Sequence, residues 1–194
     1  MPAPAPRFRS ARAEDAPAVA GLHADSWQRH YRGAYADTFL DDEAPAYLAR
    51  MWTERLAAPA DTRTILAEHD GELVGLAHTF LDNDPRWGAL VDNLHVRHTV
   101  KRQGIGTRLL ALTAAAVLRW SPTSGLYLWV LEQNATAQAF YAARGGERAG
   151  RGDVPAPGGD VARLNGKPAC FRFAWRAPSS LLVDHDRRSG SLNA

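Results

Sequence analysis

Two glycines in the middle of the chain constrain its fold more than any other feature, because they separate a strand from a helix. Residues 89–96 have the composition of a strand, and residues 105–119 repeat apolar side chains at helical spacing. Gly104 and Gly106 remove side chains where the backbone turns, so successive N–H groups can converge on an anion. The start of a helix adds partial positive charge. This segment predicts a phosphate or pyrophosphate site.

Three basic residues near the turn raise its positive potential: Lys101, Arg102 and Arg108. A Walker loop requires Gly-Lys-Ser/Thr, whereas Thr107 and Arg108 follow Gly106. A dinucleotide fingerprint requires a third glycine where Leu109 stands, and it belongs to the first βαβ unit of a chain. A strand-to-helix connection that binds nothing remains the alternative if the turn is considered alone.

The rest of the chain predicts one α/β (α+β) domain, with a mixed central sheet of about six to seven strands flanked by helices. Asp70-Gly71 predicts a hairpin turn. Six strands are expected, at residues 8–11, 64–68, 72–80, 89–96, 126–131 and 169–175. A loop is expected at 82–88 and a Gly- and Pro-rich loop at 150–159. The domain would span residues 7–176, between a disordered N-terminus (1–6) and a flexible tail (177–194).

Helix boundaries follow from capping residues and breakers. Asp15 predicts an N-cap with Pro17 in the first turn, and Asn134 predicts the start of a helix that stops at Gly145-Gly146. Between Trp27 and Arg55 two helical segments are expected, separated by a loop at Asp41-Asp42 and Pro45.

The strand and glycine turn resemble the acetyl-CoA signature of the GNAT superfamily of N-acetyltransferases, Arg/Gln-x-x-Gly-x-Gly/Ala after the fourth strand. Lys101 fills its first position here. The second motif of the family also matches: a strand ending at Val130, followed by Asn134, Ala137 and Phe140-Tyr141. Its usual Gly-Phe is replaced by Gly145-Gly146, which changes a packing contact. The resemblance covers residues 7–175.

The resemblance implies an acetyl-CoA-dependent N-acetyltransferase that acts on an amine of a small molecule, peptide or protein by direct attack in a ternary complex. The acyl group would lie between two splayed strands, where the backbone of Leu94, His95 and Val96 binds pantetheine and holds the thioester carbonyl. The other expected contacts with the coenzyme are Lys101, Arg102, Gln103, Gly104, Ile105, Gly106, Thr107, Arg108, Asn134, Ala137 and Tyr141.

The resemblance implies that Tyr141 is the general acid for the departing thiolate; helical spacing places it on one face with Asn134 and Gln138. The alternative is an ordinary tyrosine at the edge of the core. Asn134 could cap its helix, contact coenzyme A, or do both.

Asp92 is the expected general base. Strand alternation gives it the same face as Leu90, Leu94 and Val96, and a carboxylate among apolar neighbours suits base chemistry. The alternative is a hydrogen-bonded strand residue. His95 has the opposite parity; His78, Glu68, His30 or a water-mediated route are further alternatives.

Three aromatic residues are candidates for the acceptor pocket: Trp27, Tyr31 and Trp87. Aromatic residues on periodic faces belong more often to a core. Trp87 is the best candidate, since it precedes the fourth strand.

Composition favours an ordinary domain in the cytoplasm, with 45% hydrophobic and 23% charged residues and a net charge of +2. No secretory signal or membrane span is expected, and Cys170 has no partner for an intrachain disulfide. No metal is expected, because the seven histidines lack ligand spacing. A nucleic-acid partner is not expected without a basic stripe. A homodimer is compatible with the last strand. The alternative function is a non-catalytic acyl-CoA-binding or regulatory domain.

Overall fold

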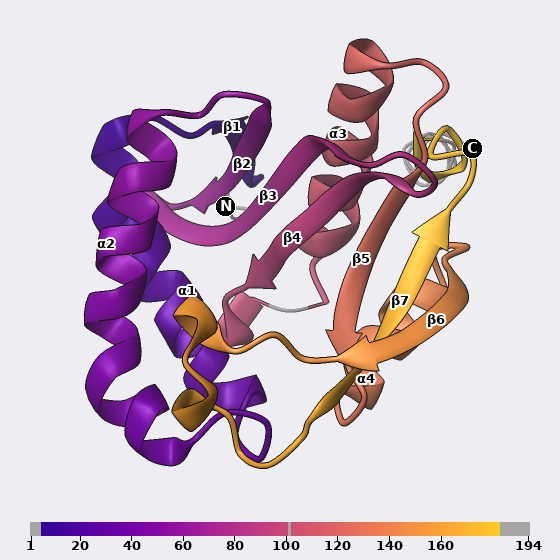
Figure 1. The fold of residues 1–194 in the computed structure, drawn as a ribbon. Coiled ribbons are helices and arrows are strands. Elements are labelled where there is room, and N and C mark those ends of the chain that lie inside the picture. The colour runs from indigo at the N-terminus through magenta and orange to yellow at the C-terminus, as the bar shows by residue number, and fades with distance from the viewer. Residues whose placement is uncertain (1–4, 101, 183–194) are drawn as a thin grey trace.

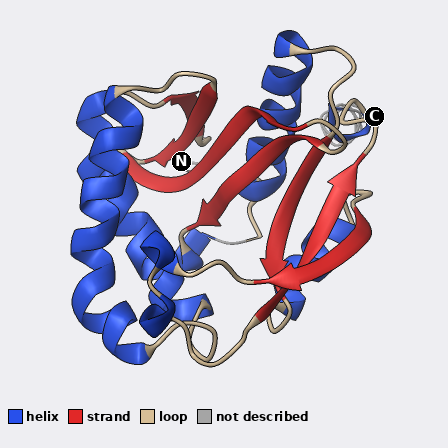
Figure 2. Ribbon diagram, viewed as in Figure 1, coloured by secondary structure: helices blue, strands red, loops and turns tan. Residues whose placement is uncertain are grey.

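The computed structural model describes residues 5–100 and 102–182, which form one seven-stranded mixed sheet with flanking helices (Figures 1 and 2). The strand order is β1-β2-β3-β4-β5-β7-β6, and only β4 and β5 pair in parallel. The strands are β1 Arg7–Ser10, β2 Thr62–His69, β3 Glu72–Asp84, β4 Gly88–Val96, β5 Leu126–Leu131, β6 Glu147–Asp153 and β7 Ala169–Trp175. The helices are α1 Ala16–His30, α2 Ala44–Ala57, α3 Ile105–Trp120 and α4 Ala135–Ala142. Five short helical turns are η1 Ala13–Asp15, η2 Phe39–Glu43, η3 His98–Val100, η4 Pro157–Gly159 and η5 Val161–Arg163. The predicted fold class is confirmed.

The β2–β3 hairpin forms at the predicted Asp70-Gly71 turn. Both residues have positive φ, 54° and 79°, as the two central positions of a type I′ turn require. The β3 strand continues to Asp84, so the predicted loop at 82–88 is shortened to the residues between Asp84 and Gly88.

The entry to α1 differs from the prediction in how Asp15 is used. Asp15 occupies the N-cap position, but its carboxylate does not cap α1. It accepts hydrogen bonds of 2.7 Å from both Arg9 terminal nitrogens and from the Arg12 amide. Asp15 therefore fixes the end of β1 against the first turn of the chain's helical region.

The predicted break at Asp41-Asp42 and Pro45 is wrong. The π-helical turn η2 passes directly into α2, and Pro45 is the second residue of α2. Phe39 and Leu40 of η2 are buried, so tertiary packing holds the turn in place.

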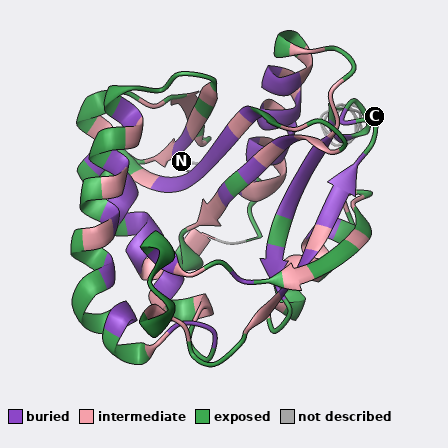
Figure 3. Cartoon of the chain, viewed as in Figure 1, coloured by how far each residue is buried: buried purple, intermediate pink, exposed green. Residues whose placement is uncertain are grey.

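Successive side chains of β2 and β3 alternate between two helical layers. Leu66 and Leu76 pack in the core with α1 and α2, whereas Ala67 and Ala77 pack against α3. The other half of the sheet, β5 and β7, shares a core with α3 and with Tyr141 of α4. Figure 3 shows buried residues along both halves of the sheet.

The β6 strand was not predicted, because residues 147–153 carry charge and glycine without apolar alternation. It is one of the two edge strands of the sheet and is mostly exposed. Beyond β7, Leu181 is only 5% exposed and packs in the core. The predicted disordered residues 1–4 and the tail residues 183–194 lie outside the described residues.

The long β6–β7 connection reaches back to the loop after α1 (Figure 1). The Ala36 amide donates to the Arg163 carbonyl, and the Asn165 amide donates to the Ala34 carbonyl, both at 2.9 Å. The Arg163 guanidinium lies 5.0 Å from the Phe39 ring centre. These contacts join the C-terminal half of the sheet to the helical layer formed by α1 and α2.

Candidate functional site

The parallel strands β4 and β5 meet at one end and separate toward the other. They pair at Ala89–Leu126, Leu90–Tyr127 and Val91–Leu128 only, whereas β5 continues to pair with β7 as far as Leu131. Figure 1 shows the two strands diverging toward their arrowheads. The edge of β4 that faces β5 is therefore free of β5 after Val91.

A β-bulge begins where the strands part. His78 of β3 pairs with Asn93, and the next residue, Thr79, pairs with Val91, so Asp92 is the extra residue. The predicted alternation is wrong beyond this point. Asp92 and Asn93 both face the α1 and α2 layer, where Arg55 contacts Asp92 and the Asn93 side chain continues toward His95.

The remaining residues of β4 follow from the bulge. Leu94 and Val96 face α3 and its core. The His95 side chain lies on the opposite face, with its ring centre 4.6 Å from that of His23 in α1. His95 thus shares a face with Asp92, contrary to the predicted parity.

The predicted glycine turn leads into α3 at the splayed end of β4. Gly104 is the N-cap residue and adopts φ 79°, which costs other residues free energy. Because Gly104 has no side chain, it cannot cap the amides of the first turn, which point out of the helix end. A Cβ added at Gly106 would lie 3.5 Å from the Phe140 ring, so this glycine faces the space between α3 and α4. Lys101 lies outside the described residues.

The start of α4 uses its polar side chains for structure. Asn134 Oδ1 accepts a 3.1 Å hydrogen bond from the Ala137 amide and so caps the helix. Gln138 Nε2 donates to the carbonyls of Leu131 and Glu132 at 3.1 and 2.8 Å. The predicted cap at Asn134 is confirmed, while α4 ends at Ala142, earlier than predicted.

Tyr141 is 8% exposed, with its ring 6.0 Å from Phe173 and 6.2 Å from Trp175. Burial raises the pKa of its hydroxyl, and the charge of Tyr31 raises it further. The phenol therefore keeps its proton at neutral pH. A Cβ at Gly146 would come within 2.7 Å of Trp175, so this indole occupies the room beside the second glycine.

Asp92 lies in a cluster of polar groups on the helix-covered face. Its Oδ2 atom is 2.7 Å from Arg55 of α2. Burial raises the pKa of Tyr31 to about 12, and the charge of Asp92 contributes to the rise.

The alternative bases His78, Glu68 and His30 all lie in structural contacts. His78 is 1% exposed, and its Nδ1 atom lies 2.7 Å from the Thr64 hydroxyl. Burial and the charge of Arg55 lower the His78 pKa to about 4. Glu68 pairs with Arg9 at 2.6 Å, at the β1 edge of the sheet. The carbonyl of His30, the last residue of α1, lies 3.5 Å from Gln133 Nε2.

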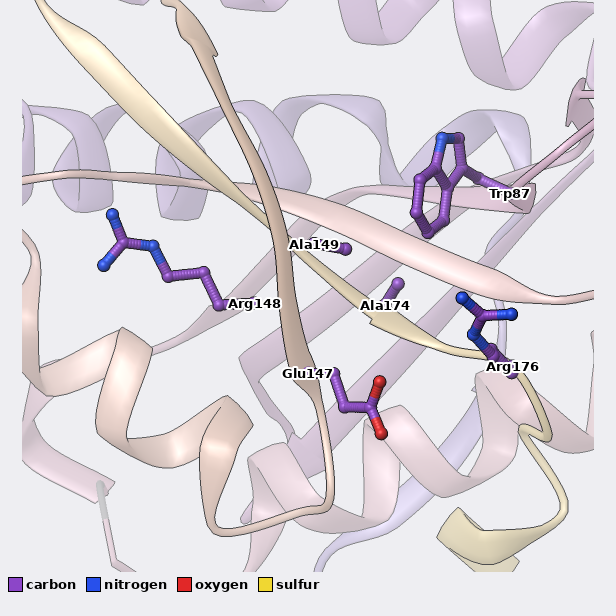
Figure 4. Close-up of a pocket in the computed structure, with 6 residues that line it drawn as sticks. All are labelled: Trp87, Glu147, Arg148, Ala149, Ala174 and Arg176. Carbon is purple, nitrogen blue, oxygen red and sulfur yellow. The ribbon is translucent and has the colours of Figure 1, made fainter.

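The three predicted acceptor residues lie in different places. Trp27 is 8% exposed, and its ring is 5.1 Å from that of Tyr35. Trp87 precedes β4, at the end opposite the glycine turn, where it borders a cavity of about 250 Å³. Figure 4 shows Trp87 and Arg176 at this cavity and Arg148 extending away from both. The structure does not bring Trp87 together with Tyr31 and Asp92.

Sequence reasoning missed Arg55 and Asn93. Arg55 follows Trp52 by three residues in α2, a spacing that places it beside the buried indole, but an arginine on a helix is usually exposed. Strict alternation places Asn93 and Asp92 on opposite faces of β4, so the contact between them, which depends on the bulge, was not predicted.

Within residues 5–100 and 102–182, no group of three or more His, Cys, Asp or Glu side chains is arranged to hold a metal ion. In the same ranges, no helix has the length and apolar character needed to cross a membrane.

Comparison with known proteins agrees with this geometry. The sequence model of the Acetyltransferase (GNAT) family matches residues 24–145. A probable N-acetyltransferase of Mycobacterium tuberculosis is 29% identical over 139 residues, covering 70% of this chain and 76% of that protein. An uncharacterized N-acetyltransferase of Lactobacillus delbrueckii subsp. lactis is 29% identical over 129 residues, covering 59% and 73%. The crystal structure of the PaiA N-acetyltransferase from Thermoplasma acidophilum in complex with coenzyme A has a TM-score of 0.66 at 17% identity, covering 89% of this chain and all of that one.

Proposed function

The chain belongs to the GNAT family of acetyltransferases, and we propose that it transfers the acetyl group of acetyl-CoA to an amine within a ternary complex. The observation that carries this proposal is the end of β4–β5 pairing at Val91–Leu128, on the side where α3 begins with Gly104. An open strand edge and an uncapped helix N-terminus at one end of the sheet suit a ligand with an amide-bearing arm and a pyrophosphate.

The donor site would consist mainly of backbone. The amides of residues 102–107, together with Arg108, would hold the pyrophosphate, and the β4 edge at residues 94–96 would bind the pantetheine amides and the thioester carbonyl. Ala137 lies on α4 beside the space that Gly106 faces. The similarity to a protein solved with coenzyme A supports this arrangement.

Tyr141 would act as the general acid. The C–S bond of the thioester breaks during transfer, and the departing sulfur must gain a proton. The hydroxyl of Tyr141 carries its proton at neutral pH, so a proton is present to donate. Its burial beside β5 and β7 would keep competing water away.

Asp92 would act as the general base. The attacking nitrogen forms the new C–N bond and loses a proton, which the carboxylate would accept directly or through one water. Asp92 lies at the bulge where β4 leaves β5, on the face where α2 contributes Arg55. The acceptor would approach from the α1 and α2 side of the gap, with Tyr31 at its edge.

The proposal is tested by following CoA thiol release from acetyl-CoA with a panel of small-molecule amines, N-terminal peptides and lysine peptides. Tyr141→Phe is expected to lower kcat about 100-fold, since general acid catalysis contributes factors of this order, while the Kd of acetyl-CoA changes less than about twofold. Tyr127→Phe is the control, because the Tyr127 hydroxyl accepts a 2.5 Å hydrogen bond from Asn83 Nδ2 at the closed end of the strands.

Three outcomes distinguish the possibilities. Loss of turnover in Tyr141→Phe alone supports the proposal. Equal turnover in both variants would show that Tyr141 is not the acid. Tight acetyl-CoA binding without CoA release for any amine would favour the non-catalytic acyl-CoA-binding domain.

A further inference from the structure

The geometry points to Asn93 and His95 as positioning residues that anchor one oxygen of Asp92, Oδ2, and leave Oδ1 to accept the proton of the amine. This inference rests on the proposed function, in which Asp92 is the base. It adds two residues and assigns different tasks to the two carboxylate oxygens.

Arg55 and Asn93 both donate hydrogen bonds to the same oxygen of Asp92. Arg55, which lies in α2, donates a 2.7 Å hydrogen bond to Oδ2. Asn93, the next residue of β4, donates a 2.6 Å hydrogen bond from Nδ2 to the same oxygen. Within the described residues, Oδ1 accepts no hydrogen bond from a protein group. When one oxygen of a carboxylate is held by donors, the orientation of the other oxygen is fixed, and that oxygen can still accept a proton.

The direction of each hydrogen bond in the chain follows from the acceptor-only carboxylate. Because Asn93 must present its NH₂ group to Asp92, its Oδ1 atom faces His95 Nε2 at 3.3 Å. Nε2 must then carry the proton of the imidazole. The other ring nitrogen, Nδ1, then accepts a 2.8 Å hydrogen bond from the Ser26 hydroxyl.

The chain thus runs from Ser26 to His95, to Asn93 and to Asp92, with every donor directed toward the carboxylate. Its members come from α1 and β4, and Arg55 joins it from α2. Asn93 is 6% exposed, and the His23 ring packs against the His95 ring at 4.6 Å. Packing therefore limits rotation of both side chains, as positioning requires.

The bulge makes the arrangement possible. In a regular strand Asp92 and Asn93 would face opposite sides of the sheet, and the amide could not reach the carboxylate. With the extra residue, both side chains face the helical layer. Pairing of β4 with β5 ends at Val91, directly before the bulge, so the donor site opens at the point where the base is oriented.

The first test is independent of activity. Nitrogen NMR of the histidine rings in the full chain, with and without acetyl-CoA, reports which ring nitrogen carries hydrogen. We expect the Nε2–H form for His95 in the wild type and in Ser26→Ala, because Asn93 Oδ1 still accepts from Nε2. A mixture of both forms is expected in Asn93→Leu, which removes that acceptor. A predominant Nδ1–H form in the wild-type protein would rule out this series of hydrogen bonds, independently of any activity measurement.

The second test separates positioning from simple stability. His95→Gln keeps an N–H group near the position of Nε2, whereas His95→Phe keeps the ring volume and loses the donor. We expect His95→Phe to lose about tenfold in kcat, the equivalent of one hydrogen bond, and His95→Gln to recover most of that loss. The KM for acetyl-CoA should stay within about twofold in both. Equal loss in both variants overturns the positioning role.

Asn93→Leu adds a pH readout. Arg55 of α2 contacts Asp92, and His95 of β4 and His23 of α1 lie on the same face. The charge of Asp92 also acts on His78 of β3 and on Tyr31 and Tyr35 after α1. Loss of the Asn93 donor removes a bond to the ionised carboxylate, so the acid limb of kcat/KM should move to higher pH, by about one unit. An unmoved limb with a lower kcat would indicate a structural role only. If Asp92→Asn retains full turnover, the proposed base fails while the NMR result on the chain still stands.

Discussion

The Arg55 guanidinium in α2 lies 2.7 Å from the Asp92 carboxylate at the bulge of β4. It also lies 5.5 Å from the ring centres of both Trp52 and Phe80. The arginine is therefore held by two aromatic rings and a carboxylate, and it connects the helical layer to the point where the sheet opens.

Replacing Arg55 with Met should lower kcat about tenfold, because Oδ2 of Asp92 loses a charge-assisted donor and the carboxylate can rotate. Steady-state kinetics at saturating acetyl-CoA measures the effect. The control is Arg29→Met, which removes an exposed pair with Asp25 on α1 and should leave kcat within about twofold. Similar losses in both variants would contradict a specific role for Arg55.

The closed end of the β4–β5 pair depends on Gly88. This glycine has φ 82°, and a Cβ there would lie 2.3 Å from the Gly125 carbonyl oxygen. Gly88→Ala should lower the free energy of unfolding by about 3 kcal/mol or more, combining a left-handed backbone with a backbone clash. Urea denaturation measures the change.

Gly71→Ala is the matched control for Gly88→Ala. Gly71 has nearly the same φ, 79°, but nothing lies within 4 Å of its Cβ position. It should therefore lose only the backbone contribution, about 1–2 kcal/mol. If the two variants lose equal stability, the close approach of the strands at Gly88 is not a constraint.

Stability should fall with acid because of His78. Burial lowers the His78 pKa to about 4, below the 6.5 of an unfolded chain, so the unfolded state takes up the proton first. The stability from His78 is complete above pH 6.5 and is lost as pH falls toward 4, amounting to about 2 kcal/mol by pH 5.

Urea denaturation between pH 7 and pH 5 measures this dependence. His78→Asn keeps a polar group near the position of Nδ1 and cannot be protonated there, so its stability should depend less on pH than that of the wild type. The slope that remains would include buried His23, whose pKa is lowered well below 6.5 by burial. Identical slopes in wild type and variant would exclude His78 as a source.

The elements with strong local signals were predictable from sequence. Asp70-Gly71 predicts its turn because both positions need positive φ, and Asn134 predicts a cap because its side chain can accept from the third residue of the helix. The glycine turn at residues 104–106 carries its own signal, since a strand leads into it and a helix follows it.

The features that were missed are set by tertiary contacts. Strand alternation alone does not predict the bulge at Asp92. The bulge reverses the face on which every later residue of β4 lies. The β6 strand exists because β7 offers it a partner. The π-turn at residues 39–43 is held by the burial of Phe39 and Leu40. Arg55 is part of the site because α2 packs on the sheet, a tertiary contact that the sequence pattern of α2 does not predict.

The central claim, an acetyl-CoA site at the splayed end of β4 and the start of α3, is tested most directly by a thermal shift with acetyl-CoA, CoA, ATP and NAD in parallel. A ligand at a hundred times its Kd adds about 2.7 kcal/mol, which is several degrees for a domain of this size. Acetyl-CoA and CoA alone should shift the wild type and Gly21→Trp, whose new side chain stands in open space on α1. The shift should disappear in Gly106→Trp, where the indole would enter the space beside Phe140. No shift of the wild type at millimolar acetyl-CoA, or an equal shift in Gly106→Trp, would contradict the account.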